Sequence, residues 1–226
     1  MTTGLEGVEL KLVNSVDEAQ NFISWLGERR PHNAIAIDTE TGELPGNPRK
    51  DALSPWHGRL RLVQVGDAMT GWSIPWDDWK GVFYESMEKF DGPLVCHNVA
   101  FEAKWFDMQS SWSIPWHRAH DTMIMGQILD PLGSGALKKL TQQYIDPQAA
   151  NLQRVLDDGL IDNGWTWGSV PLDFEPYWAY GALDPVLTMR LWEKFWPKFC
   201  PGADYSQAYE LEMNTRRIVT RMELNG

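Results

Sequence analysis

The chain has 226 residues, a hydrophobic fraction of 43% and a formal net charge of −11. This composition excludes an intrinsically disordered chain, and the length suits one large domain or one domain with an appendage. Two cysteines are too few for a disulfide framework and suggest a reducing compartment, no apolar run approaches the roughly 20 residues of a membrane span, and no signal peptide is visible. The acidic balance argues against a broad DNA-coating surface but allows a small acidic pocket that holds cations.

The first half of the chain alternates between strand and helix patterns. A helix is predicted to begin at Ser15, because Ser15 and Glu18 have the spacing of a capping box. Residues 34–38 form a short apolar run typical of a buried strand, and the proline- and glycine-rich stretch 42–58 is predicted to be a loop. Further strands are expected at 61–65 and 71–74, paired as a hairpin across Gly66-Asp67, and at 93–96, after a helix over 82–90.

Helical patterns dominate the second half, with helices predicted at 101–108, 122–129, 137–144, 177–199 and 205–225. Strands interleaved with helices, followed by helices alone, predict a three-layer α/β fold with a mixed sheet. The last helix is separate from the others. We therefore expect a main domain over residues 1–202 and a C-terminal helix over 203–226.

Two carboxylates close the first predicted strand. Asp38 and Glu40 flank Thr39 and, being two residues apart in a strand, are expected to project together from the edge of the sheet. Two unit charges about 4 Å apart repel by roughly 4 kcal/mol at an effective dielectric of 20, a cost that a cation removes. Hard oxygen ligands favour Mg²⁺ or Mn²⁺ over zinc. The alternative is that Asp38 and Thr39 only begin a solvated turn.

Two later positions offer further acidic groups. Asn98 is predicted to cap the helix after the fourth strand, and Glu102 lies four residues later on the same face. Glu102 either favours the helix dipole or is a carboxylate that faces the first pair. Tyr180 and Asp184 also share a helix face, where a phenol can hold a water beside a metal. Alternatively, Asp184 caps a new helix that begins at Pro185, and in either case a kink is expected there.

Three ordered motifs resemble those of the DEDDy-type 3′–5′ exonucleases, most of all the proofreading domain of bacterial and phage family A DNA polymerases. The motifs are Asp38-x-Glu40, Asn98-x-x-Phe101-Glu102 and Tyr180-x-x-x-Asp184. The resemblance extends over about residues 34–192 and implies a ribonuclease H-like three-layer fold, with a mixed β-sheet flanked by helices. One departure is that the family usually has Asp where this chain has Glu102.

The resemblance implies a metal-dependent enzyme that removes nucleoside 5′-monophosphates from the 3′ end of DNA by a two-metal-ion mechanism. The implied catalytic residues are Asp38, Glu40, Glu102, Tyr180 and Asp184. The four carboxylates among them would hold two Mg²⁺ or Mn²⁺ ions, and the phenol would orient the attacking water. The residues implied to bind or support the substrate are Thr39, Thr41, Leu44, Asn98 and Phe101.

The same resemblance implies partners and a compartment. The partner would be a single-stranded or frayed DNA 3′ end, presented by a polymerase domain in cis or in trans, with no membrane involved. The compartment would be the cytoplasm of a bacterial or phage-infected cell. The C-terminal helix resembles the start of a polymerase region.

Two alternatives stay open at this point. A ribonuclease D-like enzyme that trims structured RNA uses the same motifs, and Glu102 is compatible with an inactive nuclease fold that serves as a binding module. Basic residues in and after the predicted loop either flank a nucleic-acid groove or only add solubility charge; they are Arg49, Lys50, Arg59 and Arg61. Trp165 and Trp167, in a glycine-rich stretch, are the tryptophans expected to be exposed and free to stack on bases.

Overall fold

The computed structural model describes residues 6–29, 33–46, 52–147, 149 and 151–226 of the chain. In this part of the chain, six strands form one sheet: β1 (Glu9–Leu12), β2 (Ile35–Glu43), β3 (Gly58–Gly66), β4 (Thr70–Pro75), β5 (Leu94–Cys96) and β6 (Ala119–Asp121). Their order across the sheet is β1-β4-β3-β2-β5-β6. The β2–β3 and β3–β4 pairs are antiparallel and the other three pairs are parallel, so the sheet is mixed.

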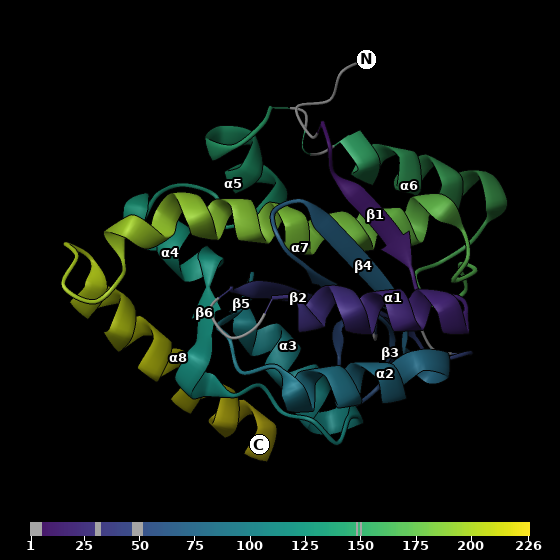
Figure 1. Cartoon of the computed structure of the whole chain (residues 1–226), viewed down its shortest axis with the longest axis horizontal. Coiled ribbons are helices and arrows are strands. Elements are labelled where there is room, and N and C mark those ends of the chain that lie inside the picture. The colour runs from purple at the N-terminus through teal and green to yellow at the C-terminus, as the bar shows by residue number, and fades with distance from the viewer. Residues whose placement is uncertain (1–5, 30–32, 47–51, 148, 150) are drawn as a thin grey trace.

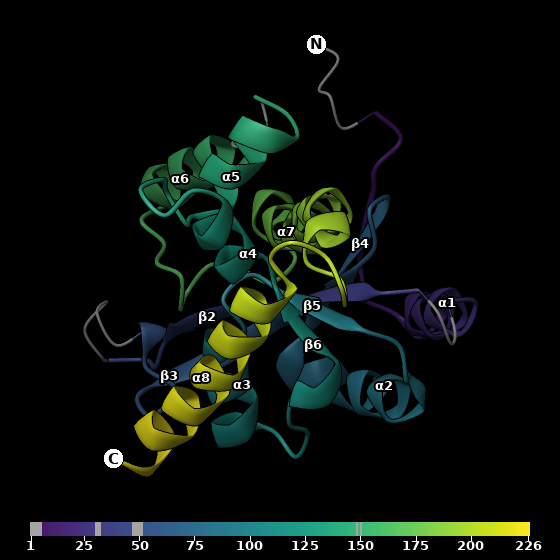
Figure 2. The same ribbon diagram turned by 90° about the vertical axis from the view of Figure 1, so that its left-hand side faces the viewer.

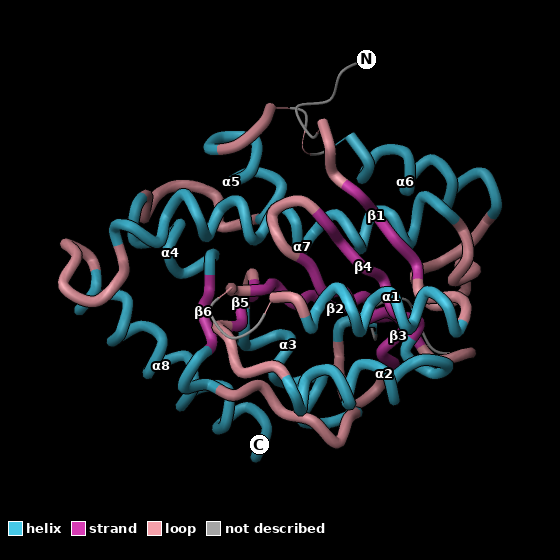
Figure 3. Tube along the Cα trace, in the orientation of Figure 1, coloured by secondary structure: helices cyan, strands magenta, loops and turns pink. Residues whose placement is uncertain are grey.

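Helices cover both faces of this sheet. Their bounds are α1 (Val16–Gly27), α2 (Trp76–Lys89), α3 (Val99–Gln109), α4 (Thr122–Leu129), α5 (Leu137–Tyr144), α6 (Asn151–Asn163), α7 (Glu175–Phe195) and α8 (Ser206–Asn225), with 3₁₀ turns η2 (Trp116–Arg118) and η3 (Trp196–Lys198). Helices α1, α2 and α3 lie on one side of the sheet, and α7 lies on the other with α4, α5 and α6 beyond it (Figure 1, Figure 2). Figure 3 shows the strands as the middle layer. The predicted three-layer α/β fold is therefore confirmed.

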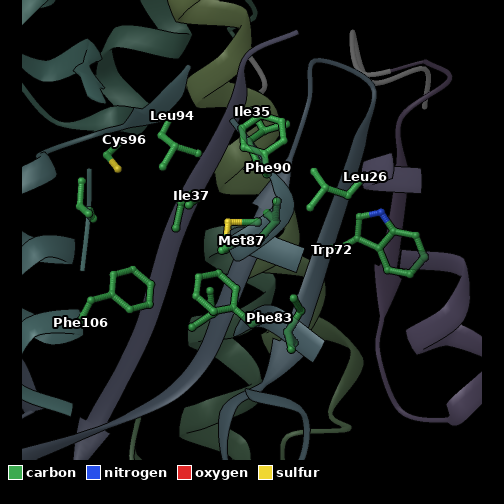
Figure 4. Close-up of a cluster of buried hydrophobic side chains, with 14 of the residues drawn as sticks. Leu26, Ile35, Ile37, Trp72, Phe83, Met87, Phe90, Leu94, Cys96 and Phe106 are labelled. Atoms are coloured by element: carbon green, nitrogen blue, oxygen red, sulfur yellow. The ribbon is translucent and has the colours of Figure 1, made fainter. Parts of the chain in front are cut away.

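The larger core lies between the sheet and the first three helices. The start of α1 is as predicted, because the backbone N–H of Glu18 donates to Ser15 Oγ at 3.2 Å. Figure 4 shows β2 residues Ile35 and Ile37 in this core beside aromatic side chains of α2 and α3. The rings of Phe83 and Phe106 stack there with centroids 5.4 Å apart, which binds α2 to α3.

The strand that carries the first carboxylates is longer than predicted. β2 continues to Glu43, and β3 begins at Gly58, so both ends of the predicted loop are strand residues. The β2–β3 pairing shifts register between Glu40 and Thr41, which is a β-bulge. Because β2 is an inner strand, Asp38 projects from a face of the sheet and not from its edge. The alternative of a solvated turn at this point is wrong.

Other elements differ from the prediction in informative ways. The sequence pattern does not predict β1 and β6, because runs of four and three residues carry too little periodicity. It does not predict α6 either, because the apolar residues of α6 do not share one face: Leu160 is buried, whereas Val155 and Ile161 are exposed. α7 runs without interruption through Pro185, so the alternative in which Asp184 caps a new helix is wrong. None of the helices in the described ranges has the length and apolar character needed to cross a lipid bilayer.

Candidate metal centre

Strand β2 presents two carboxylates to helix α7. Ala36 packs in a cluster with Met189 of α7, whereas Ile37 belongs to the core on the opposite side of the sheet. Side chains alternate along a strand, so Asp38 and Glu40 share the face of Ala36. The alternation that buries Ile37 therefore points both acids towards α7.

Close packing of α7 on the sheet brings Asp184 of the helix next to Asp38 and Glu40 of β2. A Cβ atom added to Gly71 of β4 would overlap the backbone carbonyl of Ala182, and one added to Gly181 would lie 2.6 Å from Gln64 Nε2. Glycine at these two positions therefore allows the helix to lie directly on β3 and β4. This approach places Asp184, one turn after Gly181, over the middle of the sheet.

Three carboxylates meet at this contact. Asp38, Glu40 and Asp184 each offer one oxygen, and the three oxygens lie within 4.8 Å of one another. Glu40 and Asp184 are 8% and 7% exposed, while Asp38 is half-buried. Hard, anionic oxygens converging from two elements fit a divalent cation such as Mg²⁺ or Mn²⁺.

A positive charge beside the three carboxylates belongs to Lys138 of α5. Its ammonium forms an ion pair with Asp184 Oδ1 and lies 4.4 Å from the centroid of the Tyr180 ring. Burial lowers the pKa of Lys138 to about 8, although the charges of Asp38 and Glu40 act in the opposite direction. Sequence analysis missed Lys138 as a site residue, because no local spacing links it to an acid 46 residues away.

Burial also raises the pKa values of Asp38 and Glu40. The pKa of Asp38 is raised to about 7, mainly by burial and against the opposing charge of Lys138. Burial, followed by the negative charge of Asp38, raises the pKa of Glu40 well above its usual range. Without a divalent cation, the site therefore favours protonated carboxyls, and a cation would favour the ionised forms.

Glu102 of α3 lies outside the group of three. Its side chain is 2% exposed, and among the described residues its Oε2 atom has no hydrogen-bond partner. Burial raises its pKa well above the usual range, and Asp38 is the charged group that adds most to this effect. Glu102 is thus a buried acid beside Asp38, with one oxygen free for a ligand.

Asp121 fixes the start of α3 and with it the position of Glu102. Its carboxylate accepts hydrogen bonds from the backbone N–H groups of Asn98 at 3.1 Å and Val99 at 2.8 Å. Asn98 is the N-cap residue of α3 as predicted, but it has φ +79° and its side chain makes no capping hydrogen bond. Sequence analysis did not assign this role, although Asp121 precedes a predicted helix and also caps it through Met123.

A cavity of about 340 Å³ opens beside Glu40. It is lined by Thr39, Glu40, Thr41, Ala52, Leu53, Phe101 and Trp167. Of the residues predicted to bind substrate, Thr39, Thr41 and Phe101 line it, whereas Leu44 and Asn98 do not. This cavity is bordered by acidic, hydroxyl and aromatic side chains and lies next to the three converging carboxylates. It is therefore a suitable place for a nucleotide.

The wall formed by Trp167 is held firmly to the sheet. Arg61 donates hydrogen bonds of 2.6 Å to the carbonyl oxygens of both Trp167 and Val170. Glu43, at the end of β2, accepts one of 2.9 Å from the backbone N–H of Gly168. The segment that carries Trp167 is therefore attached to the strand that carries Asp38.

These contacts correct the expectations for the basic residues. Arg59 donates to the carbonyl oxygen of Gly168 at 2.6 Å, so it and Arg61 hold the loop and are not simple solubility charges. Arg49 and Lys50 lie outside the described residues. Trp165 and Trp167 are half-buried and not fully exposed.

Comparison with known proteins assigns the family. A family model described as 3′–5′ exonuclease matches residues 12–199, which is most of the chain. The chain belongs to this 3′–5′ exonuclease family. No curated protein sequence matches it significantly.

Solved structures share the fold of this exonuclease domain. The catalytic core of RRP6 from Trypanosoma brucei matches with a TM-score of 0.66 at 14% identity, over 97% of this chain and 55% of that one. Escherichia coli RNase D matches with a TM-score of 0.62 at 15% identity, over 97% of this chain and 51% of that one. Brucella melitensis NrnC with bound Mg²⁺ matches with a TM-score of 0.61 at 16% identity, over 97% and 94%. The chain spans about half the length of the RRP6 and RNase D chains, and the likeness establishes the ribonuclease H-like fold.

Proposed function

We propose that this exonuclease domain uses divalent metal ions to remove nucleoside 5′-monophosphates from the 3′ end of DNA. The observation that carries the proposal is the group of oxygens from Asp38, Glu40 and Asp184, all within 4.8 Å of one another. The DNA substrate rests on the resemblance to proofreading domains of family A polymerases. A polymerase domain, in cis or in trans, would then supply the frayed 3′ end.

The chain's own residues have distinct roles in this proposal. Asp38, Glu40 and Asp184 would hold one Mg²⁺ or Mn²⁺ ion, and Glu102 beside Asp38 would complete a second position. Bound divalent ions supply Lewis-acid stabilisation of the attacking and leaving oxygens. Burial raises the pKa of Tyr180, so the phenol keeps its proton and orients the attacking water by a hydrogen bond without deprotonating it.

The cavity beside Glu40 is the proposed site of the terminal nucleotide. Its volume of about 340 Å³ lies within the range of roughly 300–1,000 Å³ that is common for ligand sites. Thr41 would contact the 3′-terminal sugar, and Phe101 and Trp167 would contact the base. Leu44, which is exposed just after β2, remains our proposal for a residue beside the last base.

A second candidate function is 3′ trimming of RNA. The observation that favours it is the fold shared with E. coli RNase D, described as an exoribonuclease involved in structured RNA processing. At 15% identity this likeness establishes a fold and no substrate. Matched DNA and RNA substrates would distinguish the two functions directly.

The proposal is tested with 5′-labelled single-stranded, duplex and mismatched DNA, and with RNA of the same sequence, each with and without Mg²⁺. Asp38→Asn is expected to abolish stepwise 3′ shortening, because it removes the carboxylate that both metal positions share. Asp162→Asn, a change at an exposed residue of α6, is the matched control and should cleave normally. Full activity in Asp38→Asn would refute the assignment, and absence of a thermal shift with Mn²⁺ in the wild type would favour a binding module.

A further inference from the structure

Lys138 is a charged group beside the carboxylates for which the proposed exonuclease mechanism has no role. The side chain of Lys138 is 17% exposed and the side chain of its partner Asp184 is 10% exposed, so this is a largely buried ion pair. The face of the Tyr180 ring lies 4.4 Å from the ammonium and supports it from one side. Burying an ammonium costs free energy unless it is paired with a negative charge. The negative charge of the nearby carboxylates therefore explains why the Lys138 ammonium can be buried here.

The ammonium acts on all three carboxylates of the group. It touches Asp184 directly, and its charge acts on both Asp38 and Glu40. Within the described ranges, no other Lys or Arg side chain forms an ion pair with any of the three. Lys138 therefore offsets part of the negative charge of the three carboxylates before any divalent ion binds.

A lysine and a divalent ion would both bind the carboxylate of Asp184. The carboxylate oxygen that accepts from Lys138 is Asp184 Oδ1, and Asp184 is one of the three acids that converge within 4.8 Å. An ammonium that remained among these oxygens would add positive charge next to the incoming ion and withhold one carboxylate from it. The flexible four-carbon stem of a lysine allows the head group to leave without a change in the backbone of α5.

We propose that Lys138 is the resident counter-ion of the metal centre: in the metal-free protein it pairs with Asp184 and offsets part of the negative charge at Asp38, Glu40 and Asp184, and it competes with the divalent ion for these acids. This inference rests on the proposed function, because the ion in question is that of the exonuclease site. It makes Lys138 a positioning residue that keeps the three acids together until the metal arrives. It predicts that removal of the lysine charge lowers the stability of the metal-free protein and raises its affinity for the divalent ion.

The test uses the full chain and Mn²⁺ alone as the probe. Lys138→Met keeps most of the apolar stem and removes the charge. Titration calorimetry with MnCl₂ should give a dissociation constant lower than that of the wild type by about tenfold or more. In EDTA the same variant should melt at a lower temperature than the wild type, because three converging carboxylates lose their counter-ion, and saturating Mn²⁺ should remove this difference.

Control variants separate this role from general packing. Lys139→Met, at the exposed neighbouring position of α5, should change neither measurement, and Lys138→Arg, which keeps the positive charge, should restore the melting temperature in EDTA. If Lys138→Met does not fold, Lys138→Gln takes its place. An affinity for Mn²⁺ that is unchanged or weaker in the neutral variant overturns the inference while leaving the exonuclease proposal intact. Absence of Mn²⁺ binding in both proteins overturns the proposed function itself.

Discussion

Glu102 is the residue at which this chain departs from the usual family pattern. Glutamate carries one methylene more than aspartate, and in α3 that extra length reaches a buried place beside Asp38. Its Oε2 atom lacks a hydrogen-bond partner among the described residues, which is costly for a buried carboxyl. Such a cost is reasonable at a site that a ligand completes, and it argues for a role in binding the second ion.

The Glu102→Gln variant tests this role. An amide of the same shape cannot become a charged ligand, so 3′ shortening with Mg²⁺ should fall by about tenfold or more, the effect of roughly 1.4 kcal/mol in the barrier. Because burial and the charge of Asp38 oppose ionisation of Glu102, the melting temperature in EDTA should be unchanged or higher. Gel assays and thermal melts measure the two effects, with Glu88→Gln, at an exposed site, as the control. An equally active Glu102→Gln would remove Glu102 from the site.

Some site residues are predictable from the periodicity of the sequence, and others are not. Asp38 and Glu40 are found from the period of a strand, and Tyr180 and Asp184 from the period of a helix, because each pair lies within one element. Lys138 reaches Asp184 across 46 positions, and such a contact depends on how α5 packs against α7. No periodicity in one sequence contains that information.

At the scale of elements, the site depends on how closely α7 lies on the sheet. Gly71 of β4 has no side chain where the carbonyl of Ala182 passes, and on the same helix Asp184 follows half a turn later. The backbone carbonyl of Ala182 cannot move aside as the end of a flexible side chain can. The distance between helix and sheet is therefore set in part by Gly71, a residue far in sequence from all three carboxylates.

The Gly71→Ala variant should separate these two elements. The added methyl group would overlap the Ala182 carbonyl, so α7 must shift away from β4 and carry Asp184 from Asp38. We expect weaker Mn²⁺ binding, loss of most 3′ shortening, and destabilisation of about 1–3 kcal/mol, typical of overpacking. Chemical denaturation and calorimetry measure these effects. Gly27→Ala, where an added Cβ meets nothing within 4 Å, should retain wild-type Mn²⁺ binding, and equal behaviour of the two variants would contradict the argument.

Elements themselves were predictable where their own pattern was strong. The bounds of α4 and α5 are those that hydrophobic spacing predicts, and the capped start of α1 follows from Ser15 and Glu18. The predicted end of β2 is too early, because the proline and glycine residues that follow it indicate a loop. Pairing with β3 carries this strand through its bulge to Glu43, and tertiary pairing of this kind overrides local preference.

At the scale of the whole molecule, α8 crosses the end of the sheet beside β6 (Figure 2). Tyr209 of α8 is 6% exposed, and its hydroxyl accepts a 2.8 Å hydrogen bond from the backbone N–H of Asp121. Its ring stacks near that of His120, with centroids 6.3 Å apart. The C-terminal helix is thus joined to the residue that positions α3, and through α3 to Glu102.

His120 should make this junction sensitive to acid. Burial lowers the pKa of His120 from 6.5 to about 4, so the folded protein resists a proton that the unfolded chain accepts. The stabilising contribution is complete above pH 6.5 and is lost as the pH falls towards 4, by up to about 3 kcal/mol. The raised pKa of Asp38 acts with the opposite sign, because the folded state then binds the extra proton. Melting curves between pH 4.5 and 7.5 should therefore show a smaller acid loss in His120→Phe than in the wild type, since Asp38 is common to both proteins. Parallel curves would mean that His120 does not control the junction.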